Sequence, residues 1–214
     1  MSVEELADVV GKVAAVATIG TFFAPVFICW NIIKKKSSKN IDPTPFIGGM
    51  AMSILMIKNG ILMNDPNIIP VNIFGFLLNL LYFLVYYTYT ANTGPLFSML
   101  KKVTLFTGIL WGYTMVENEK LVEYRFGVIL TLLMFTLVGS PLFSLKEIIT
   151  AQDASMLPFP MILSGTVVGS LWLVYGLLID NIFIKVQNVA TVILCGIQLA
   201  LIYKYPKKED KKTD

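Results

Sequence analysis

The sequence contains no histidine, and the middle of its long apolar segments contains no aspartate or glutamate. Histidine and buried carboxylates are the usual general acids, general bases and metal ligands of enzymes. The sequence also contains no catalytic triad, no glycine-rich phosphate loop and no metal-binding spacing. The chain is therefore not expected to be an enzyme, and its residues imply no cofactor or metal.

Cysteine and charge are also scarce. Cys29 and Cys195 are the only cysteines and both lie in apolar segments, so we interpret them as small buried residues. Charged residues make up 14% of the chain, whereas a soluble domain averages about 25%. The basic residues show no nucleic-acid signal beyond clusters that membrane topology explains, so no nucleic-acid partner is expected.

Apolar residues are abundant and account for 56% of the 214 residues. A helix that crosses a membrane needs about 20 mostly apolar residues. Seven segments meet this requirement, at residues 6–33, 44–63, 68–89, 96–116, 126–145, 159–179 and 182–203. The sequence therefore predicts an all-α membrane protein with seven transmembrane helices and the lipid bilayer as its surroundings.

The basic residues are distributed unevenly between the two sides of these helices. Twelve fall on one side, namely Lys34, Lys35, Lys36, Lys39, Lys101, Lys102, Lys146, Lys204, Lys207, Lys208, Lys211 and Lys212. Four fall on the other side, namely Lys12, Lys120, Arg125 and Lys185. Because basic loops mark the cytoplasmic side, the N-terminus is expected outside and the C-terminus in the cytoplasm.

Lys58 belongs to neither group, because it lies inside the second segment near its outer end. We interpret it as a side chain that extends to the membrane interface. A direct role at a substrate or an anion is the alternative.

The two halves of the chain share rare residues at a constant offset of 116 positions. The matching pairs include Pro25 and Pro141, Phe27 and Phe143, Gly60 and Gly176, Asn72 and Asn188, and Tyr89 and Tyr205. Such a shared register indicates duplication. The first three helices therefore match the last three, and the fourth helix has no counterpart. This linker helix gives both three-helix units the same orientation, so they are expected to be parallel repeats.

This 3+1+3 arrangement predicts four regions of the chain. They are a first three-helix bundle at 1–92, a linker helix and outer loop at 93–122, a second bundle at 123–205 and a charged cytoplasmic tail at 206–214.

Four prolines lie near the cytoplasmic ends of the predicted helices: Pro25, Pro45, Pro141 and Pro158. A proline inside a helix removes a hydrogen bond and bends the helix. We therefore expect hinges around a gate at this side. The repeat is imperfect here, because Pro45 follows Pro25 by 20 residues whereas Pro158 follows Pro141 by 17.

The polar residues expected near the middle of the membrane are neutral. They are Asn72, Asn188, Thr18, Thr21, Ser53, Ser170 and Trp172. Amides offer both donors and acceptors to the hydroxyl groups of a sugar, and an indole ring can stack on the apolar face of a pyranose. We interpret Asn72 and Asn188 as one binding site built twice. The alternative is that these asparagines only join helices.

Several motifs give the chain a resemblance to the SWEET sugar transporters, eukaryotic members of the PQ-loop (MtN3/saliva) superfamily. The motifs are Ala24-Pro25-Val26-Phe27, Thr44-Pro45-Phe46, Val71-Asn72-Ile73-Phe74-Gly75, Gly139-Ser140-Pro141-Leu142, Leu157-Pro158-Phe159, Leu171-Trp172-Leu173-Val174-Tyr175-Gly176 and Gln187-Asn188. The resemblance extends to about Tyr205. Short loops and a short tail make the chain more similar to animal members than to plant members.

The resemblance implies a role for each of these positions. The four prolines would form the proline tetrad of the family, and Asn72 and Asn188 would be its substrate asparagines. Trp172 would stack on the sugar, and Thr21 and Leu137 would line the pocket. The first half departs from the family pattern, because Met56 stands at the duplicate of Trp172 and Asn59 replaces the usual tyrosine.

The preferred interpretation is a facilitator that moves neutral sugars such as glucose or sucrose in both directions by alternating access, without ion coupling. The family implies a homo-oligomer in the plasma membrane, with the Golgi or other internal membranes as further locations. One alternative is a PQ-loop amino-acid exporter or adaptor, although the sequence contains no Pro-Gln dipeptide. The other alternative is a seven-helix receptor, although the short loops and the internal repeat of this chain argue against a receptor.

Overall fold

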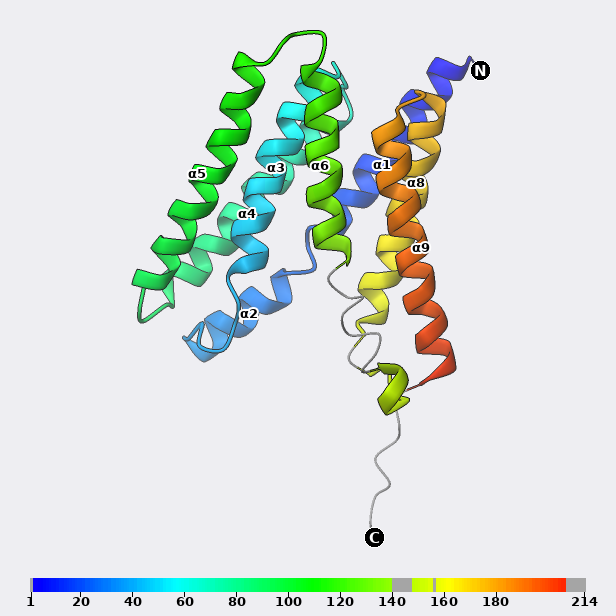
Figure 1. Cartoon of the computed structure of the whole chain (residues 1–214). Coiled ribbons are helices and arrows are strands. Elements are labelled where there is room, and N and C mark those ends of the chain that lie inside the picture. Colours follow the sequence, from blue (N-terminus) through cyan, green and yellow to red (C-terminus); the bar gives the residue numbers. More distant parts are fainter. Residues whose placement is uncertain (1, 140–147, 156, 207–214) are drawn as a thin grey trace. The chain divides into compact units, whose positions relative to one another are not determined.

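The computed structural model describes residues 2–139, 148–155 and 157–206, and the only regular secondary structure in these ranges is helix. The helices are α1 (Val3–Thr21), α2 (Val26–Lys35), α3 (Thr44–Leu62), α4 (Ile68–Thr88), α5 (Gly94–Val116), α6 (Val122–Gly139), α8 (Phe159–Leu178) and α9 (Ile182–Lys204) (Figure 1). The chain divides into two compact units, one formed by Ala15–Gly127 and the other by Met1–Ala14 with Val128–Asp214.

Most of the predicted helices are confirmed. Helices α3, α4, α5, α8 and α9 begin and end within two residues of the predicted segments. Helix α6 begins four residues before the predicted segment 126–145, and residues 140–145 lie outside the described part of the chain. Long apolar runs with clear polar ends made these boundaries predictable.

The predicted segment 6–33 lies within one apolar stretch, Val3–Lys35, that is long enough to cross a membrane. It is not one continuous helix, because helix α1 ends at Thr21 and α2 begins at Val26. Residues 22–25 form a turn with hydrogen bonds three residues apart, such as Val26 N–H to the Phe23 carbonyl at 3.0 Å. Pro25 has no N–H group and cannot continue the helical ladder. The proline predicted to bend this helix therefore interrupts it.

The unit Ala15–Gly127 is organised around α4. Helix α3 packs antiparallel against α4 and also contacts α5, and α2 contacts α4 (Figure 1). The side chains buried between these elements form one apolar cluster of Cys29, Ile32, Phe46, Ile47, Met50, Tyr82, Phe83, Tyr86 and Leu96. This cluster lies where α2, the start of α3, the C-terminal half of α4 and the start of α5 meet.

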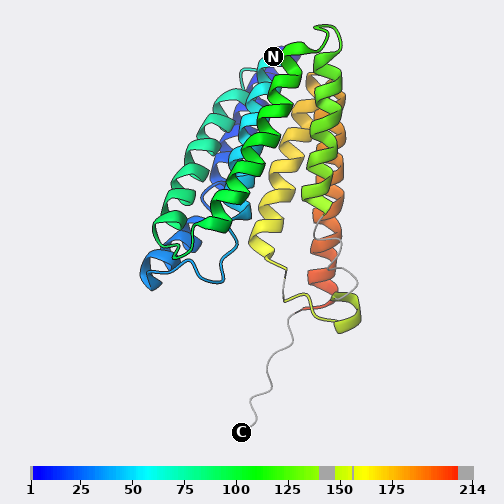
Figure 2. The ribbon, with the colours of Figure 1, turned by 60° about the vertical axis from the view of Figure 1, so that its left-hand side comes forward.

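In the other unit, α8 and α9 form an antiparallel pair joined by a short turn (Figure 2). Glycines allow the two helices to approach closely. A Cβ atom on Gly176 would lie 2.7 Å from Cγ2 of Ile184, and one on Gly169 would lie 3.2 Å from Cγ2 of Thr191. The short α8–α9 turn and these glycines together fix the register of the pair.

The turn after α3 and the turn after α8 have the same local geometry. Asn64 and Asp180 have positive φ angles of 52° and 53°, a conformation that Asn and Asp adopt more readily than most residues. The next residue donates its N–H to the glycine carbonyl in each case, from Asp65 to Gly60 at 2.9 Å and from Asn181 to Gly176 at 3.0 Å. All of these pairs are 116 positions apart.

The same offset relates the loops at the opposite ends of the helix pairs. Lys36 and Gln152 both have a φ angle of 51°. Ser38 N–H donates to the Tyr89 carbonyl at 3.1 Å, and Ala154 N–H donates to the Tyr205 carbonyl at 2.9 Å. The two halves therefore share backbone hydrogen bonds at both ends of their helix pairs, as duplication of one unit would produce.

Five stretches among the described residues are long and apolar enough to cross a membrane. They are Val3–Lys35, which includes the break at Pro25, Thr44–Leu62, Ile68–Thr88, Phe159–Leu178 and Ile182–Lys204. Because these stretches carry many exposed apolar side chains, a lipid environment explains a surface that water would not tolerate.

Candidate functional site

The two predicted site asparagines have the same local geometry. Asn72 of α4 donates its Nδ2–H to the carbonyl of Ile68 at 2.8 Å, and Asn188 of α9 donates to the carbonyl of Ile184 at 2.8 Å. Both side chains are partly buried. Among the described residues, neither amide makes a further hydrogen bond through its Oδ1 or its second N–H.

Trp172, the residue expected to stack on a sugar, contacts a second aromatic residue of the same helix. The ring of Trp172 lies edge-on to that of Tyr175, with centroids 5.5 Å apart and planes at 80°. Both side chains come from α8, one turn apart. Their arrangement is the T-shaped contact that aromatic rings favour, and it fixes the orientation of the indole.

The matching wall of the first half is built differently. Met56 of α3 is partly buried and stands at the position that corresponds to Trp172. Asn59, at the position of Tyr175, is buried and donates its amide to the sulfur of Met63 at 3.2 Å. A flexible thioether and an amide therefore stand in the first half where the second half has an aromatic pair.

The remaining predicted pocket residues are less well defined. Thr21 is the last residue of α1, and its hydroxyl donates to the Thr18 carbonyl at 2.7 Å. Leu137 belongs to α6, but its side chain lies outside the described residues. Within the unit Ala15–Gly127 the structure describes Thr21, Met56 and Asn72, whereas Asn188 and Trp172 belong to the other unit.

Gly75 is a residue whose role the sequence did not reveal. It follows Asn72 by one turn of α4, and a Cβ atom on it would lie 2.8 Å from the Phe22 ring and 3.2 Å from Oγ of Ser53. The second half has the larger and smaller residues reversed. The first half pairs Ser53 of α3 with Gly75 of α4, whereas the corresponding residues are Gly169 of α8 and Thr191 of α9. In the sequence, the only sign of this close contact was that Gly75 belongs to the same motif as Asn72.

The prolines take two kinds of position. Pro25 directly precedes α2, and Pro141 lies outside the described residues. Pro158 is the N-cap residue of α8, whereas Pro45 is the second residue of α3. Proline is tolerated in the first turn of a helix. By place in the helix, Pro158 therefore corresponds to Pro43, the N-cap residue of α3.

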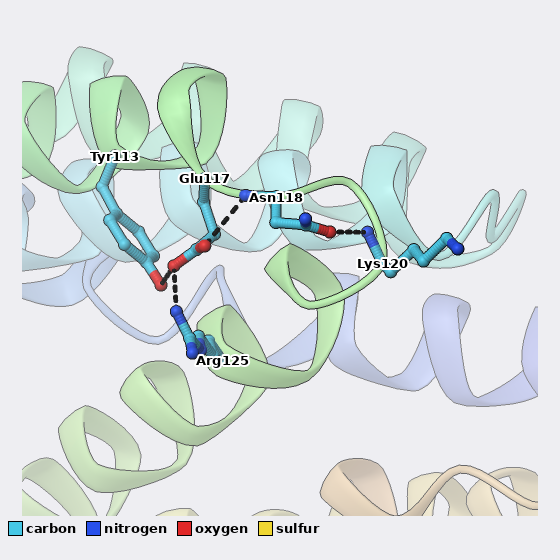
Figure 3. Close-up of polar contacts among 5 residues, drawn as sticks. All are labelled: Tyr113, Glu117, Asn118, Lys120 and Arg125. Atoms are coloured by element: carbon cyan, nitrogen blue, oxygen red, sulfur yellow. Dashed lines mark hydrogen bonds and ion pairs between the residues drawn. The ribbon is translucent and has the colours of Figure 1, made fainter.

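A polar cluster stabilises the turn between α5 and α6 (Figure 3). The carboxylate of Glu117 accepts from Tyr113 Oη at 2.6 Å, from Arg125 Nη1 at 2.7 Å and from the Asn118 N–H at 2.8 Å. These bonds, first those from Tyr113 and Arg125, lower the pKa of Glu117 to about 2. The Glu117 side chain is only 13% exposed, so the cluster is a compact clamp at the C-terminal end of α5.

Lys58, whose role was left open, lies over the ring of Trp111, with Nζ 5.4 Å from the centroid. The contact joins α3 to α5 and is a cation–π interaction. It supports neither the interfacial role nor the anion-binding role in particular.

Among the described residues, no group of three His, Cys, Asp or Glu side chains could hold a metal ion.

Comparisons with known proteins identify relatives over nearly the whole chain. The family described as "Sugar efflux transporter for intercellular exchange" matches the sequence twice, at residues 8–94 and 124–210. The two matched segments begin 116 residues apart, which is the offset that aligns the two halves.

Individual relatives come from animals and plants. "Sugar transporter SWEET1" of Drosophila pseudoobscura pseudoobscura is 28% identical over 94% of this chain and 90% of that protein. "Sugar transporter SWEET1" of Caenorhabditis elegans is 28% identical over 98% of this chain and 69% of that protein. "Bidirectional sugar transporter SWEET9" of Arabidopsis thaliana is 27% identical over 100% of this chain and 84% of that protein.

Among solved structures, a eukaryotic SWEET transporter at 3.7 Å resolution matches with a TM-score of 0.82 and 22% identity. The match covers 94% of this chain and 98% of that protein, so the two share a fold. The apolar helices and these relatives together make the chain a multi-pass membrane protein. On the double match of its family model, the chain belongs to the MtN3/SWEET family of transporters.

Proposed function

We propose that this chain moves neutral sugars across a membrane in both directions and without ion coupling. The observation that carries the proposal is the pair of asparagines with the same geometry, Asn72 and Asn188, in a member of the SWEET family. Relatives of similar sequence are named sugar transporters, and the Arabidopsis relative is named bidirectional.

The proposed sugar site combines amides with one aromatic face. Each asparagine has an amide oxygen and an N–H that the described residues leave unused, and sugar hydroxyls can both donate to and accept from such groups. Trp172, oriented by Tyr175, would stack on the sugar. Met56, Thr21 and Leu137 would complete the lining and influence the size of sugar accepted.

Absence of ion coupling is proposed from the chemistry of the described helices. Their middle sections carry no carboxylate and the chain has no histidine, so a buried proton relay has no candidate residue there. Asp65 is buried, but it lies in the α3–α4 turn and its Oδ1 accepts from the N–H groups of Asn67 and Ile68. That carboxylate therefore caps a helix.

The transport cycle would be alternating access in a seven-span, 3+1+3 arrangement with an outer N-terminus and a cytoplasmic C-terminus. The proposed regions are the repeats at 1–92 and 123–205, the linker at 93–122 and the tail at 206–214. The local geometry shared by the two halves supports duplication of one unit.

Pro25, Pro45, Pro141 and Pro158 would act as hinges of the cytoplasmic gate. The break in the helix at Pro25 supports a hinge there. We further propose a homo-oligomer in the plasma membrane, because the family implies both.

The test of the site is exchange of radiolabelled glucose or sucrose in proteoliposomes with single-residue variants. Asn72→Ala and Asn188→Ala should each abolish exchange while the protein remains folded. Asn79→Ala is the matched control, because Asn79 lies two turns after Asn72 on α4. Its amide makes the same type of bond, to the Gly75 carbonyl at 2.8 Å. Exchange that persists in the Asn72 and Asn188 variants, or that is lost equally in the control, would refute the site.

A further inference from the structure

The break before α2 leaves the Phe22 carbonyl without its helical partner. In a continuous helix, the Phe22 carbonyl would accept from the N–H four residues later, which belongs to Val26. That N–H instead donates to the Phe23 carbonyl at 3.0 Å, and Pro25 has no N–H to offer. The hydroxyl of Tyr82, 60 residues away on α4, donates to the Phe22 carbonyl at 2.9 Å. A phenol thus replaces the missing amide.

A second phenol bonds to the backbone beyond the other end of α2. The Tyr86 hydroxyl donates to the carbonyl of Ile41 at 2.9 Å, in the segment that connects α2 to α3. Two further bonds support this segment, because Ser38 donates its N–H and its hydroxyl to the Tyr89 carbonyl at 3.1 Å and 3.2 Å. Both non-helical segments that flank α2 are therefore bonded to α4.

Burial and ring packing restrict the motion of the two tyrosine side chains. They lie four residues apart on one face of α4 and are 6% and 8% exposed. Both rings pack against Phe46 at the start of α3, with centroids 6.2 Å and 6.0 Å away. Buried phenols need a hydrogen-bond partner, and these two backbone carbonyls supply it.

The second half of the sequence does not repeat these residues. The positions that correspond to Tyr82 and Tyr86 are Gln198 and Ile202, and neither side chain has a phenol. The backbone bond to the closing tyrosine is nevertheless common to both halves, from Ser38 to Tyr89 and from Ala154 to Tyr205. The phenol bonds are therefore an addition to the shared plan.

We infer that Tyr82 and Tyr86 are positioning residues that fix α2 to α4, so that the two helices move as one body. Motion at the Pro25 break then requires the Tyr82 bond to open, and motion of the α2–α3 connection requires the Tyr86 bond to open. The inference concerns the break itself and holds whatever the chain transports.

Amide hydrogen exchange of the full-length protein in lipid nanodiscs tests this inference. Tyr82→Phe should accelerate exchange in residues 22–29 by about fivefold, the effect expected from losing one net hydrogen bond. Tyr86→Phe should accelerate exchange in residues 37–43 by a similar factor. Each variant keeps its ring, so packing against Phe46 is retained.

Tyr87→Phe is the matched control, because Tyr87 follows Tyr86 on the same helix. Its ring packs against Phe97 with centroids 5.7 Å apart, and no hydrogen bond of its hydroxyl occurs among the described residues. This variant should exchange like the parent protein. The inference is overturned if Tyr82→Phe and Tyr86→Phe leave their segments unchanged. It is also overturned if Tyr87→Phe has the same effect, or if exchange rises uniformly over α3 and α4.

Discussion

At the scale of single residues, the two halves of the proposed site differ in rigidity. Trp172 is oriented by its edge contact with Tyr175, whereas its duplicate Met56 has no aromatic neighbour at the corresponding position, which Asn59 occupies. Because a ring presents a larger and stiffer surface than a thioether, the second half should contribute more of the stacking energy for a sugar.

Substitution of these two residues tests this difference. Trp172→Ala should weaken sugar binding by about tenfold, the effect of losing roughly 1.4 kcal/mol of stacking and burial. Met56→Ala should weaken binding less, and Trp172→Phe should recover part of the loss. Isothermal titration of the purified protein with glucose and sucrose measures all three. An equal loss from Met56→Ala and Trp172→Ala would contradict the asymmetric site.

The sequence was sufficient to predict that Asn72 and Asn188 occupy equivalent positions in the two halves, because a constant offset aligned them with Gly60, Gly176 and the closing tyrosines. The matching hydrogen bonds of Asn72 and Asn188 agree with that alignment. The exact helix positions of the prolines could not be predicted from residue type. A proline at an N-cap, such as Pro158, and a proline in a first turn, such as Pro45, look alike in a sequence.

At the scale of elements, close helix pairing depends on glycine in both halves. A Cβ atom on Gly60 would lie 2.8 Å from Cγ1 of Ile69, and one on Gly176 would lie 2.7 Å from Cγ2 of Ile184. Real Cβ atoms do not approach so closely, so a larger residue must push the helices apart. Each turn between the paired helices, α3–α4 and α8–α9, would be strained by that movement.

Gly60→Ala and Gly176→Ala should therefore each destabilise the fold by about 1–3 kcal/mol, the usual effect of overpacking. Gly112→Ala in α5 is the control, because no atom lies within 4 Å of its added Cβ. That variant should be neutral or slightly stabilising, since alanine favours helix. Thermal unfolding in detergent compares the three. A stable Gly60→Ala or Gly176→Ala protein would show that the helix pairs tolerate separation.

The α5–α6 turn depends on an ionised Glu117. Its pKa of about 2 lies below the ordinary value of 4.5, so the folded protein favours the carboxylate. The stabilisation is present above pH 4.5 and is lost as the pH falls toward 2. The clamp is therefore complete at neutral pH and fails only in acid.

Glu117→Gln should lower the thermal unfolding temperature at neutral pH, because it removes the charge that Arg125 and Tyr113 bind. The difference between parent and variant should shrink as the pH falls from 4.5 toward 2. The unfolding temperatures of both proteins are measured at several pH values. Other carboxylates titrate in both proteins, so their effect cancels in the difference. A difference that stays constant with pH would exclude the clamp as its cause.

The full break between α1 and α2 could not be predicted from the sequence. Pro25 predicted a bend, and its missing N–H explains why the ladder is lost. The partner of the freed Phe22 carbonyl is Tyr82, which is 60 residues distant. No local pattern connects these residues, so a full interruption could not be told from a kink. The other helix boundaries needed only local hydrophobicity and were predicted within a few residues.

At the scale of the whole molecule, the chain combines a duplicated membrane fold with neutral polar groups at the matched positions. Its family and its fold are those of SWEET transporters. The described helices offer no carboxylate in their middle sections to couple sugar movement to protons. We propose uncoupled transport, in which the sugar gradient alone sets the direction of flux.

Radiolabelled glucose and sucrose flux in proteoliposomes, measured with and without an imposed pH gradient, tests this claim most directly. Saturable flux of at least one sugar should run in both directions, at a rate and to a final level that the pH gradient leaves unchanged. Accumulation of sugar against its own gradient when the pH gradient is imposed, or no flux of either sugar by the folded protein, would contradict the account.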